Sequence, residues 1–280
     1  MVMSAGSALA EQKHLARPDQ TTVNSAPVMS AASQRQSVTV LVRDAKGNQL
    51  GSGVLMGSAS DGYWVVTNRH VVQDQKDACV VTTDRRVSPA QVIFPGKEDH
   101  LTMLDIAFLW LPRSSKDPLM VATMALKPLD ASQLPIVIAT GYPTTLEHRD
   151  APLYRERSGL LVPLLRKPLQ GGFDLGYTAI VEKGMSGGGV FVGVNLIGIN
   201  GAHANPLWQG TWLDQQGQFV DGKLNEKLEL VSLGLSTQMI QAGLKLSLDS
   251  SNDNLKALAE LECRALKGPQ AASNTNTTTW

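Results

Sequence analysis

Short apolar runs separated by turn-forming residues recur along the first half of the chain. The runs are rich in valine, leucine and isoleucine, and polar clusters such as Asp44-Ala-Lys-Gly-Asn48 lie between them. They occupy residues 37–42, 51–57, 63–68, 78–83, 90–94 and 105–111. Runs of this length and composition are typical of strands, and glycine, asparagine and aspartate are typical of the turns between them. Six short strands predict one barrel in this half.

A second set of short runs follows a segment that prolines interrupt. Four prolines between residues 112 and 135 indicate a crossing between two halves. The later runs occupy residues 135–142, 159–165, 174–181, 188–193 and 195–201. Residues 202–230 carry Trp208, Trp212 and the polar turn Asp214-Gln-Gln-Gly217, which predicts an inserted hairpin. The pattern therefore predicts an all-β fold in two halves of similar size.

The two ends of the chain differ in character from this β pattern. Residues 1–36 lack a helical or strand period and predict a flexible leader, in which Ala8-Leu9-Ala10 is either a truncated export signal or part of a plain terminus. Residues 231–246 pass from a strand-like start into a helix-like run. Spaced leucines then predict an amphipathic C-terminal helix over 247–268, and residues 269–280 predict a disordered tail.

Composition narrows the classes of function. Lysine plus arginine and aspartate plus glutamate number 25 each, so no overall charge draws nucleic acid or an anionic membrane surface. No run approaches the about 20 apolar residues of a membrane helix, which predicts no membrane span. Cys79 and Cys263 either pair or remain thiols, and the count leaves the redox compartment open. No ligand cluster or phosphate-binding loop is present, so we expect no metal and no cofactor.

Ser186 lies in the glycine-rich segment Gly184-Met-Ser-Gly-Gly-Gly189. A serine hydroxyl needs a base, a group that orients the base, and donors for the oxyanion it creates. His70 follows an apolar strand where a loop begins, and Asp105 is the single acid in an apolar run, so it needs a buried donor. Each residue alone also fits an ordinary role, as part of a turn, as a structural histidine or as an acid at a strand end.

The three segments together are more specific than any one of them. TNRHVV, LDIAFL and GMSGGGVF occur in the order His, Asp, Ser over the two β halves. This pattern resembles the chymotrypsin-like serine peptidases, closest to the HtrA/Deg-like bacterial branch but without its PDZ domain. The resemblance implies two six-stranded antiparallel β-barrels with a C-terminal helix. Residues 37–120 would form the first barrel with His70 and Asp105, and residues 121–246 the second barrel with Ser186.

The resemblance also implies roles for individual residues. Ser186 would be the nucleophile, His70 the general base and acid, and Asp105 its orienter, with the amides of Gly184 and Ser186 as oxyanion hole. The implied activity is endopeptidase cleavage of polypeptide substrates through an acyl-enzyme. Met185 replaces the aspartate that pairs with a freshly cut N-terminus in digestive enzymes, so that activation route should be absent.

Substrate contacts follow from the same resemblance. Ile199, Asn200 and Gly201 would pair with the peptide backbone, and Ile180 would line the primary specificity pocket. Because Ile180 is not acidic, we expect small or medium apolar side chains before the cut and not lysine or arginine. The oligomeric state stays open, and the expected location is periplasmic or secreted, with the cytoplasm as the alternative.

Two other functions compete with this interpretation. Gly184-x-Ser186-x-Gly188 also matches the nucleophile elbow of α/β-hydrolases, but that elbow leads into a helix and its histidine follows the serine. A glycine and β-branched run follows Ser186 instead. The stronger competitor is a catalytically weak or inactive protease-like module that binds peptides.

Overall fold

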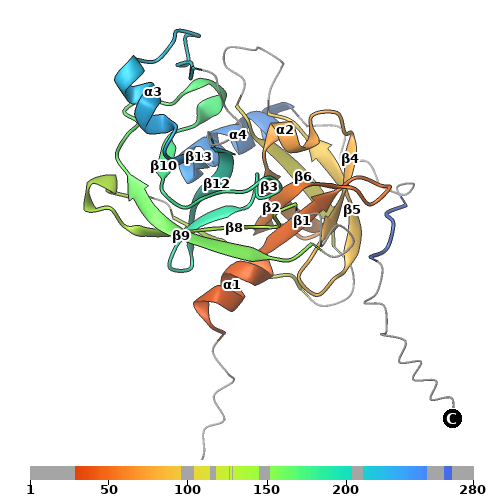
Figure 1. The fold of residues 1–280 in the computed structure, drawn as a ribbon. Helices are drawn as coiled ribbons and strands as arrows, with labels where there is room; N and C mark the ends of the chain where they lie inside the picture. Colours follow the sequence, from red (N-terminus) through yellow and green to blue (C-terminus); the bar gives the residue numbers. More distant parts are fainter. Residues whose placement is uncertain are drawn as a thin grey trace, which may run out of the picture.

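The chain forms two β-barrels that lie side by side (Figure 1). The structure, a computed structural model, describes residues 29–95, 104–113, 118–144 apart from 126 and 128, 152–203, 211–250 and 262–266. The predicted signal remnant and the predicted tail over 269–280 lie outside these residues. In the view of Figure 1 the first barrel is on the right and the second on the left.

The first barrel is a closed sheet with the strand order β1-β2-β3-β6-β5-β4, and every neighbouring pair is antiparallel. Its strands are β1 (Thr39–Arg43), β2 (Gln49–Ser58), β3 (Gly62–Thr67), β4 (Asp77–Val81), β5 (Val87–Ile93) and β6 (Ala107–Pro112). Branched side chains such as Val40, Val54 and Val65 are fully buried in its core. Closure leaves no free sheet edge, which is one way in which short strands form a stable unit.

The second barrel is also closed and six-stranded, in the order β11-β8-β9-β10-β13-β12, with the β11–β12 pairing completing the ring. Its strands are β8 (Ile136–Gly141), β9 (Arg155–Val162), β10 (Leu175–Tyr177), β11 (Gly189–Val192), β12 (Asn195–His203) and β13 (Ser232–Ser236). The two-residue strand β7 (Thr123–Met124) pairs parallel to β12 in the crossing segment. The predicted fold of two six-stranded antiparallel barrels is therefore confirmed.

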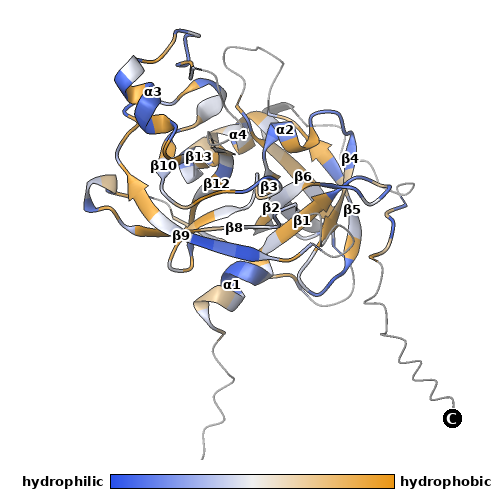
Figure 2. Ribbon diagram, in the orientation of Figure 1, coloured by the Kyte–Doolittle hydropathy of each residue, from blue (hydrophilic) through white to orange (hydrophobic). Residues whose placement is uncertain are grey.

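The predicted leader is shorter than residues 1–36, because a helix, α1 (Ala31–Val38), precedes β1. Ser30 caps it by accepting a hydrogen bond from the amide of Ser33. Arg35 is buried and forms an ion pair with Glu156 of β9, whose nitrogen and oxygen atoms are 2.8 Å apart. Figure 2 shows that β9 is hydrophilic near α1 and hydrophobic at its other end. Residues 29–36 thus belong to the fold.

The insertion between β12 and β13 is more than the predicted hairpin over 202–230. A bridge between Leu213 and Phe219 closes a small hairpin around the predicted polar turn, and the helix α3 (Gly222–Leu228) follows it. Asp221 caps α3 with its side chain. The ring of Trp212 is buried and lies edge-on to Phe173, so the insertion packs on the segment before β10.

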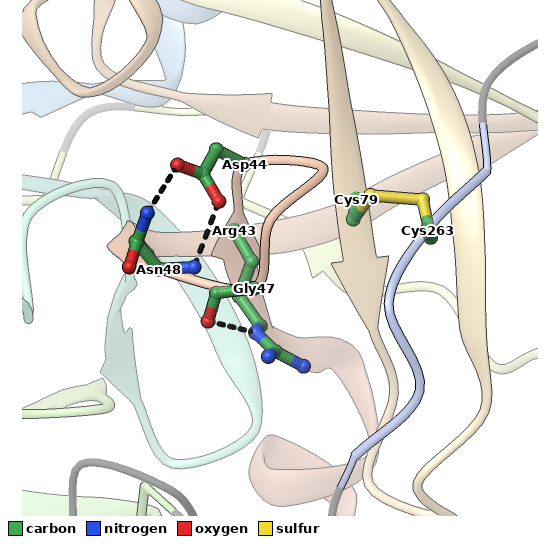
Figure 3. Close-up of a disulfide and its surroundings, with 6 residues drawn as sticks. All are labelled: Arg43, Asp44, Gly47, Asn48, Cys79 and Cys263. Carbon is green, nitrogen blue, oxygen red and sulfur yellow. Dashed lines mark hydrogen bonds between the residues drawn. A yellow bond between two sulfur atoms is a disulfide. The ribbon is translucent and has the colours of Figure 1, made fainter.

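The C-terminal helix α4 (Thr237–Ser250) begins directly after β13 and packs near Ile106 and Phe108 of the first barrel. The helix predicted over 247–268 is wrong for residues 262–266, which have no helical structure, and its middle lies outside the described residues. Cys263 is held away from a helical path because it forms a disulfide with Cys79 of β4 (Figure 3). Within the described residues, no helix is long and apolar enough to cross a membrane.

Candidate active site

His70 and Asp105 of the first barrel lie in direct contact. His70 belongs to the short helix α2 (Arg69–Val72) after β3, and Asp105 precedes β6. The carboxylate of Asp105 accepts two hydrogen bonds from His70, from the main-chain N–H through Oδ1 at 2.9 Å and from Nδ1 through Oδ2 at 2.8 Å. Asn68 donates to the main-chain oxygen of Asp105 at 3.0 Å. These bonds fix both the ring and its partner.

The carboxylate also sets the protonation of the imidazole. An ionised carboxylate only accepts hydrogen bonds, so Nδ1 carries the proton and Nε2 keeps a free lone pair. Burial alone lowers the pKa of His70, but its hydrogen bond to Asp105 and the negative charge of that carboxylate outweigh burial and raise this pKa above its usual value. The His70 side chain is 46% exposed and the Asp105 side chain 15% exposed. The ring can therefore exchange protons with a bound molecule.

Ser186 lies on a loop of the second barrel that packs against the His70 side of the first. A side chain at Gly187 would meet Thr67 of β3, and one at Gly51 would lie between Val71 and the main chain of Ser186. The Ser186 hydroxyl donates to the main-chain oxygen of Gly201 at 3.4 Å. In the described part of the chain, it makes no hydrogen bond to His70.

The main-chain carbonyl groups of residues 182–186 in the Ser186 loop all accept hydrogen bonds. The carbonyl of Glu182 accepts from Met185 N, that of Lys183 from Thr144 N, and that of Gly184 from Ser52 Oγ. The carbonyl of Met185 accepts from Gly188 N and Asn200 Nδ2, and that of Ser186 from Ser52 N. The amides of Gly184 and Ser186 donate to no acceptor among the residues that the structure describes. Because C=O and N–H point in opposite directions across a trans peptide, held carbonyls leave these two amides free for an oxygen of a ligand.

Glycine is required where this loop turns. Gly184 has φ +95°, and Gly187 has φ +81° with the position of a Cβ atom only 2.3 Å from the main-chain oxygen of Ser52. Both conditions exclude larger residues. Met185 between them is fully buried against apolar residues of the second barrel, so the loop carries no acidic group at this position.

The substrate contacts expected at Ile199 and Asn200 are wrong. Both residues are fully buried, and β12 is paired there on both sides, with β11 through Gly189↔Ile199 and with β13 through Ile199↔Leu235. The main-chain N–H and C=O of Asn200 are bonded to Gly188 and Gly187 at 2.7 and 2.9 Å. No polar group of this strand is left there for a peptide.

The free edge of β12 begins one residue later than Asn200. Ala202 and His203 extend beyond the start of β11 and, among the described residues, pair only with β13, while Gly201 lies at a register shift in that pairing. Of the residues at this edge, Gly201 was predicted from the sequence as a substrate contact. Ala202 and His203 were not. The sequence held no signal for them, because the difference in length between β11 and β12 appears only in the structure. Ile180 is 61% exposed, and its place in a specificity pocket stays a prediction.

The comparison with known families concerns the part of the chain that holds these residues. The family model described as a trypsin-like peptidase domain matches residues 51–199, a range that contains His70, Asp105 and Ser186. The chain belongs to the trypsin-like peptidase domain family. The range also contains Ser52, Gly184 and most of β12, so the inter-barrel contacts of the Ser186 loop lie within the matched part of this peptidase domain.

Solved structures support the fold of this trypsin-like peptidase domain. One of those that match is the crystal structure of the Rv3671c protease in an inactive form, with a TM-score of 0.52 and 18% sequence identity over 83% of this chain and 98% of that chain. At this identity the likeness shows the fold alone. No curated protein sequence matches the chain. The placement in the HtrA/Deg-like branch stays a prediction.

Among the described residues, no group of three or more histidine, cysteine, aspartate and glutamate side chains could hold a metal ion.

Proposed function

We propose that the protein is a serine endopeptidase in which Ser186, His70 and Asp105 form the catalytic triad. The observation that carries this proposal is the pair of hydrogen bonds between His70 and Asp105, which leaves Nε2 available as a base. Ser186 Oγ attacks the scissile carbonyl while its proton passes to His70 Nε2, and the C=O electron pair moves onto oxygen. The amides of Gly184 and Ser186 stabilise that oxyanion.

Collapse of the oxyanion then expels the leaving amine, which takes the proton back from His70, and an acyl-enzyme remains on Ser186. Water repeats the same steps with His70 as base and releases the acid. No step needs a cofactor. When the Ser186 hydroxyl leaves the main-chain oxygen of Gly201, that oxygen becomes free to accept a hydrogen bond from an N–H of the substrate.

The substrate peptide would add to the free edge of β12 at residues 201–203. Ile180 would line the pocket for the side chain before the cut, which favours small or medium apolar residues. Cleavage profiles on a peptide library test this assignment. A profile dominated by lysine or arginine would contradict it.

The nucleophile is tested with a fluorophosphonate probe and with casein. The wild-type protein should react with the probe and cleave casein, and Ser186→Ala should do neither while unfolding at a similar temperature. Ser158→Ala is the matched control, since Ser158 is an exposed serine of β9 in the same barrel. Cleavage retained by Ser186→Ala would point to another nucleophile.

The alternative function is a peptide-binding module without catalysis. The observation in its favour is that the Ser186 hydroxyl is bonded to Gly201 and not to His70. Absence of labelling in the folded wild-type protein, together with retained binding of extended peptides, would support this alternative and refute the enzyme.

We also propose an oxidising location, periplasmic or extracellular. The disulfide between Cys79 and Cys263 supports this proposal, since such bonds persist mainly outside the cytosol. Cell fractionation with a tagged full-length chain tests it. Recovery of the protein in the cytosol with both cysteines reduced would contradict it.

A further inference from the structure

Ser52 of β2 connects the first barrel to three points of the second. Its hydroxyl donates to the main-chain oxygen of Gly184 at 2.7 Å and accepts from the main-chain N–H of Tyr142 at 2.9 Å. Its own N–H donates to the main-chain oxygen of Ser186 at 2.8 Å. The side chain is fully buried, and a Cβ atom at Gly141 would lie 3.0 Å from its hydroxyl. The hydroxyl thus has a closed environment and two specific partners.

These contacts act on the peptide groups that flank the amide of Gly184. The peptide after Gly184 is held through its carbonyl by the Ser52 hydroxyl. The peptide before it, which carries the Gly184 N–H, is held through the Lys183 carbonyl by Thr144 N at 2.7 Å. Thr144 is two residues beyond Tyr142, whose N–H is bonded to the same hydroxyl. Ser52 therefore acts on one peptide directly and on the other through the segment 142–144.

The residue between Gly184 and Ser186 has no charged group that could replace this support. Met185 is fully buried among apolar side chains and offers only van der Waals contact. Gly184 has φ +95° and lacks a Cβ atom, so its neighbouring peptides can rotate with little steric resistance. A loop of this kind keeps one orientation only if its carbonyls are held, because a buried polar group that loses its partner turns to find another.

We propose that Ser52 is a positioning residue that holds the amide of Gly184 toward the substrate carbonyl. The inference rests on the proposed peptidase function and extends it to a residue of the other barrel. Without the hydroxyl, the oxygen of Gly184 and the N–H of Tyr142 lose their partners in a buried space. Rotation of the peptides around Gly184 then restores hydrogen bonding but turns an oxyanion donor away.

The test compares Ser52→Ala with the wild-type protein on a fluorogenic peptide amide that has alanine or valine before the cut. We expect kcat to fall about 10- to 100-fold, less than or near the ~10²–10³-fold loss found when an oxyanion donor is removed outright. KM should stay within about twofold, because the hole holds the oxyanion more strongly than the ground-state carbonyl.

A peptide boronate of the same sequence provides a second readout. Its boron accepts the electron pair of Ser186 Oγ, the hydroxyl proton passes to His70, and a boronate oxygen occupies the position of the oxyanion. The inhibition constant of this compound should rise in parallel with the fall in kcat. A purely structural role of Ser52 would change thermal unfolding without this parallel change.

Ser247→Ala is the matched control, since Ser247 is also a buried serine whose hydroxyl donates to a main-chain oxygen, that of Gly243 at 3.0 Å. It should change neither kcat nor boronate binding. If Ser52→Ala does not fold, Gln49→Ala tests the same support, because the half-buried Gln49 side chain donates to the Tyr142 oxygen. A smaller fall in kcat, again without a change in KM, is then expected.

Two results would overturn the inference. One is a folded Ser52→Ala protein with kcat within threefold of wild type, and the other is a fall in kcat with unchanged boronate affinity. Either result leaves the peptidase function intact. By contrast, a wild-type protein that neither reacts with a fluorophosphonate nor cleaves the peptide would refute the proposed function itself, and the role of Ser52 with it.

Discussion

Replacing Arg35 by methionine should weaken the attachment of α1 to the second barrel. The guanidinium donates to both carboxylate oxygens of Glu156 at 3.0 and 2.8 Å and to the main-chain oxygen of Gly193 at 2.7 Å. The two side chains are 9% and 25% exposed. Exposed ion pairs contribute about 0–1 kcal/mol, whereas removal of one partner from a buried pair costs about 3–5 kcal/mol. We expect an intermediate loss of about 2–3 kcal/mol in the free energy of unfolding.

Denaturant unfolding of the full chain measures this loss. Arg155→Met is the control, since Arg155 is an exposed arginine of β9 next to Glu156, and it should change stability by less than about 0.5 kcal/mol. A double-mutant cycle of Arg35→Met with Glu156→Gln should give a coupling energy of at least about 1 kcal/mol. A single-variant loss below 1 kcal/mol, or no coupling, would refute the view that this pair anchors the helix.

The ion pair between Arg35 and Glu156 also predicts how the stability of the fold depends on pH. Burial raises the pKa of Glu156, but the hydrogen bonds from Arg35 and Tyr154 and the positive charge of Arg35 outweigh it and lower this pKa below 4.5. A carboxyl with a lowered folded pKa stabilises the fold above its unfolded pKa and loses that contribution as pH falls through the folded value. The stability difference between wild type and Arg35→Met should therefore shrink in acid.

Two further predictions concern the base and the disulfide. Because Asp105 raises the pKa of His70, kcat/KM should rise with pH around a midpoint above the usual pKa of histidine. Asp105→Asn should move this midpoint down and lower kcat by up to about 10⁴-fold. A pH–rate profile with an unmoved midpoint would contradict the contact between Asp105 and His70. Cys263→Ser should lower the free energy of unfolding by about 2–5 kcal/mol, since the bond joins residues 184 positions apart, and a thermal scan showing no change would contradict this.

The strands were predictable because their signal is local. Short runs between turn residues predicted six strands in the first barrel and five runs and one strand-like start, at residues 231–246, in the second. The structure confirms the fold, although β9 begins at Arg155, before its predicted run. The helix α1 was missed because its sequence, AASQRQSV, has no apolar stripe, and it is held by a tertiary contact of Arg35. The helix predicted over 247–268 failed at its end because Cys263 is bound to β4. Neither contact leaves a local mark in the sequence.

The candidate site likewise has one part that the sequence could predict and one part that it could not. The need of Asp105 for a buried donor could be inferred from its apolar surroundings, and the structure places His70 there at 2.8 Å. The exposed edge of β12 could not be located in the same way, because it depends on the register between β11 and β12. That register leaves Ile199 covered and Gly201 at the edge.

The disulfide in Figure 3 has a consequence for a peptidase that meets its own chain. Cys79 belongs to the first barrel, and Cys263 follows the last strand of the second, so the bond closes a covalent ring that includes Ser186. One cut in any loop between these cysteines opens the ring but releases no fragment. A self-nicked molecule would therefore run as a single band on a gel without reductant and as two bands with it, and its barrels would stay tethered.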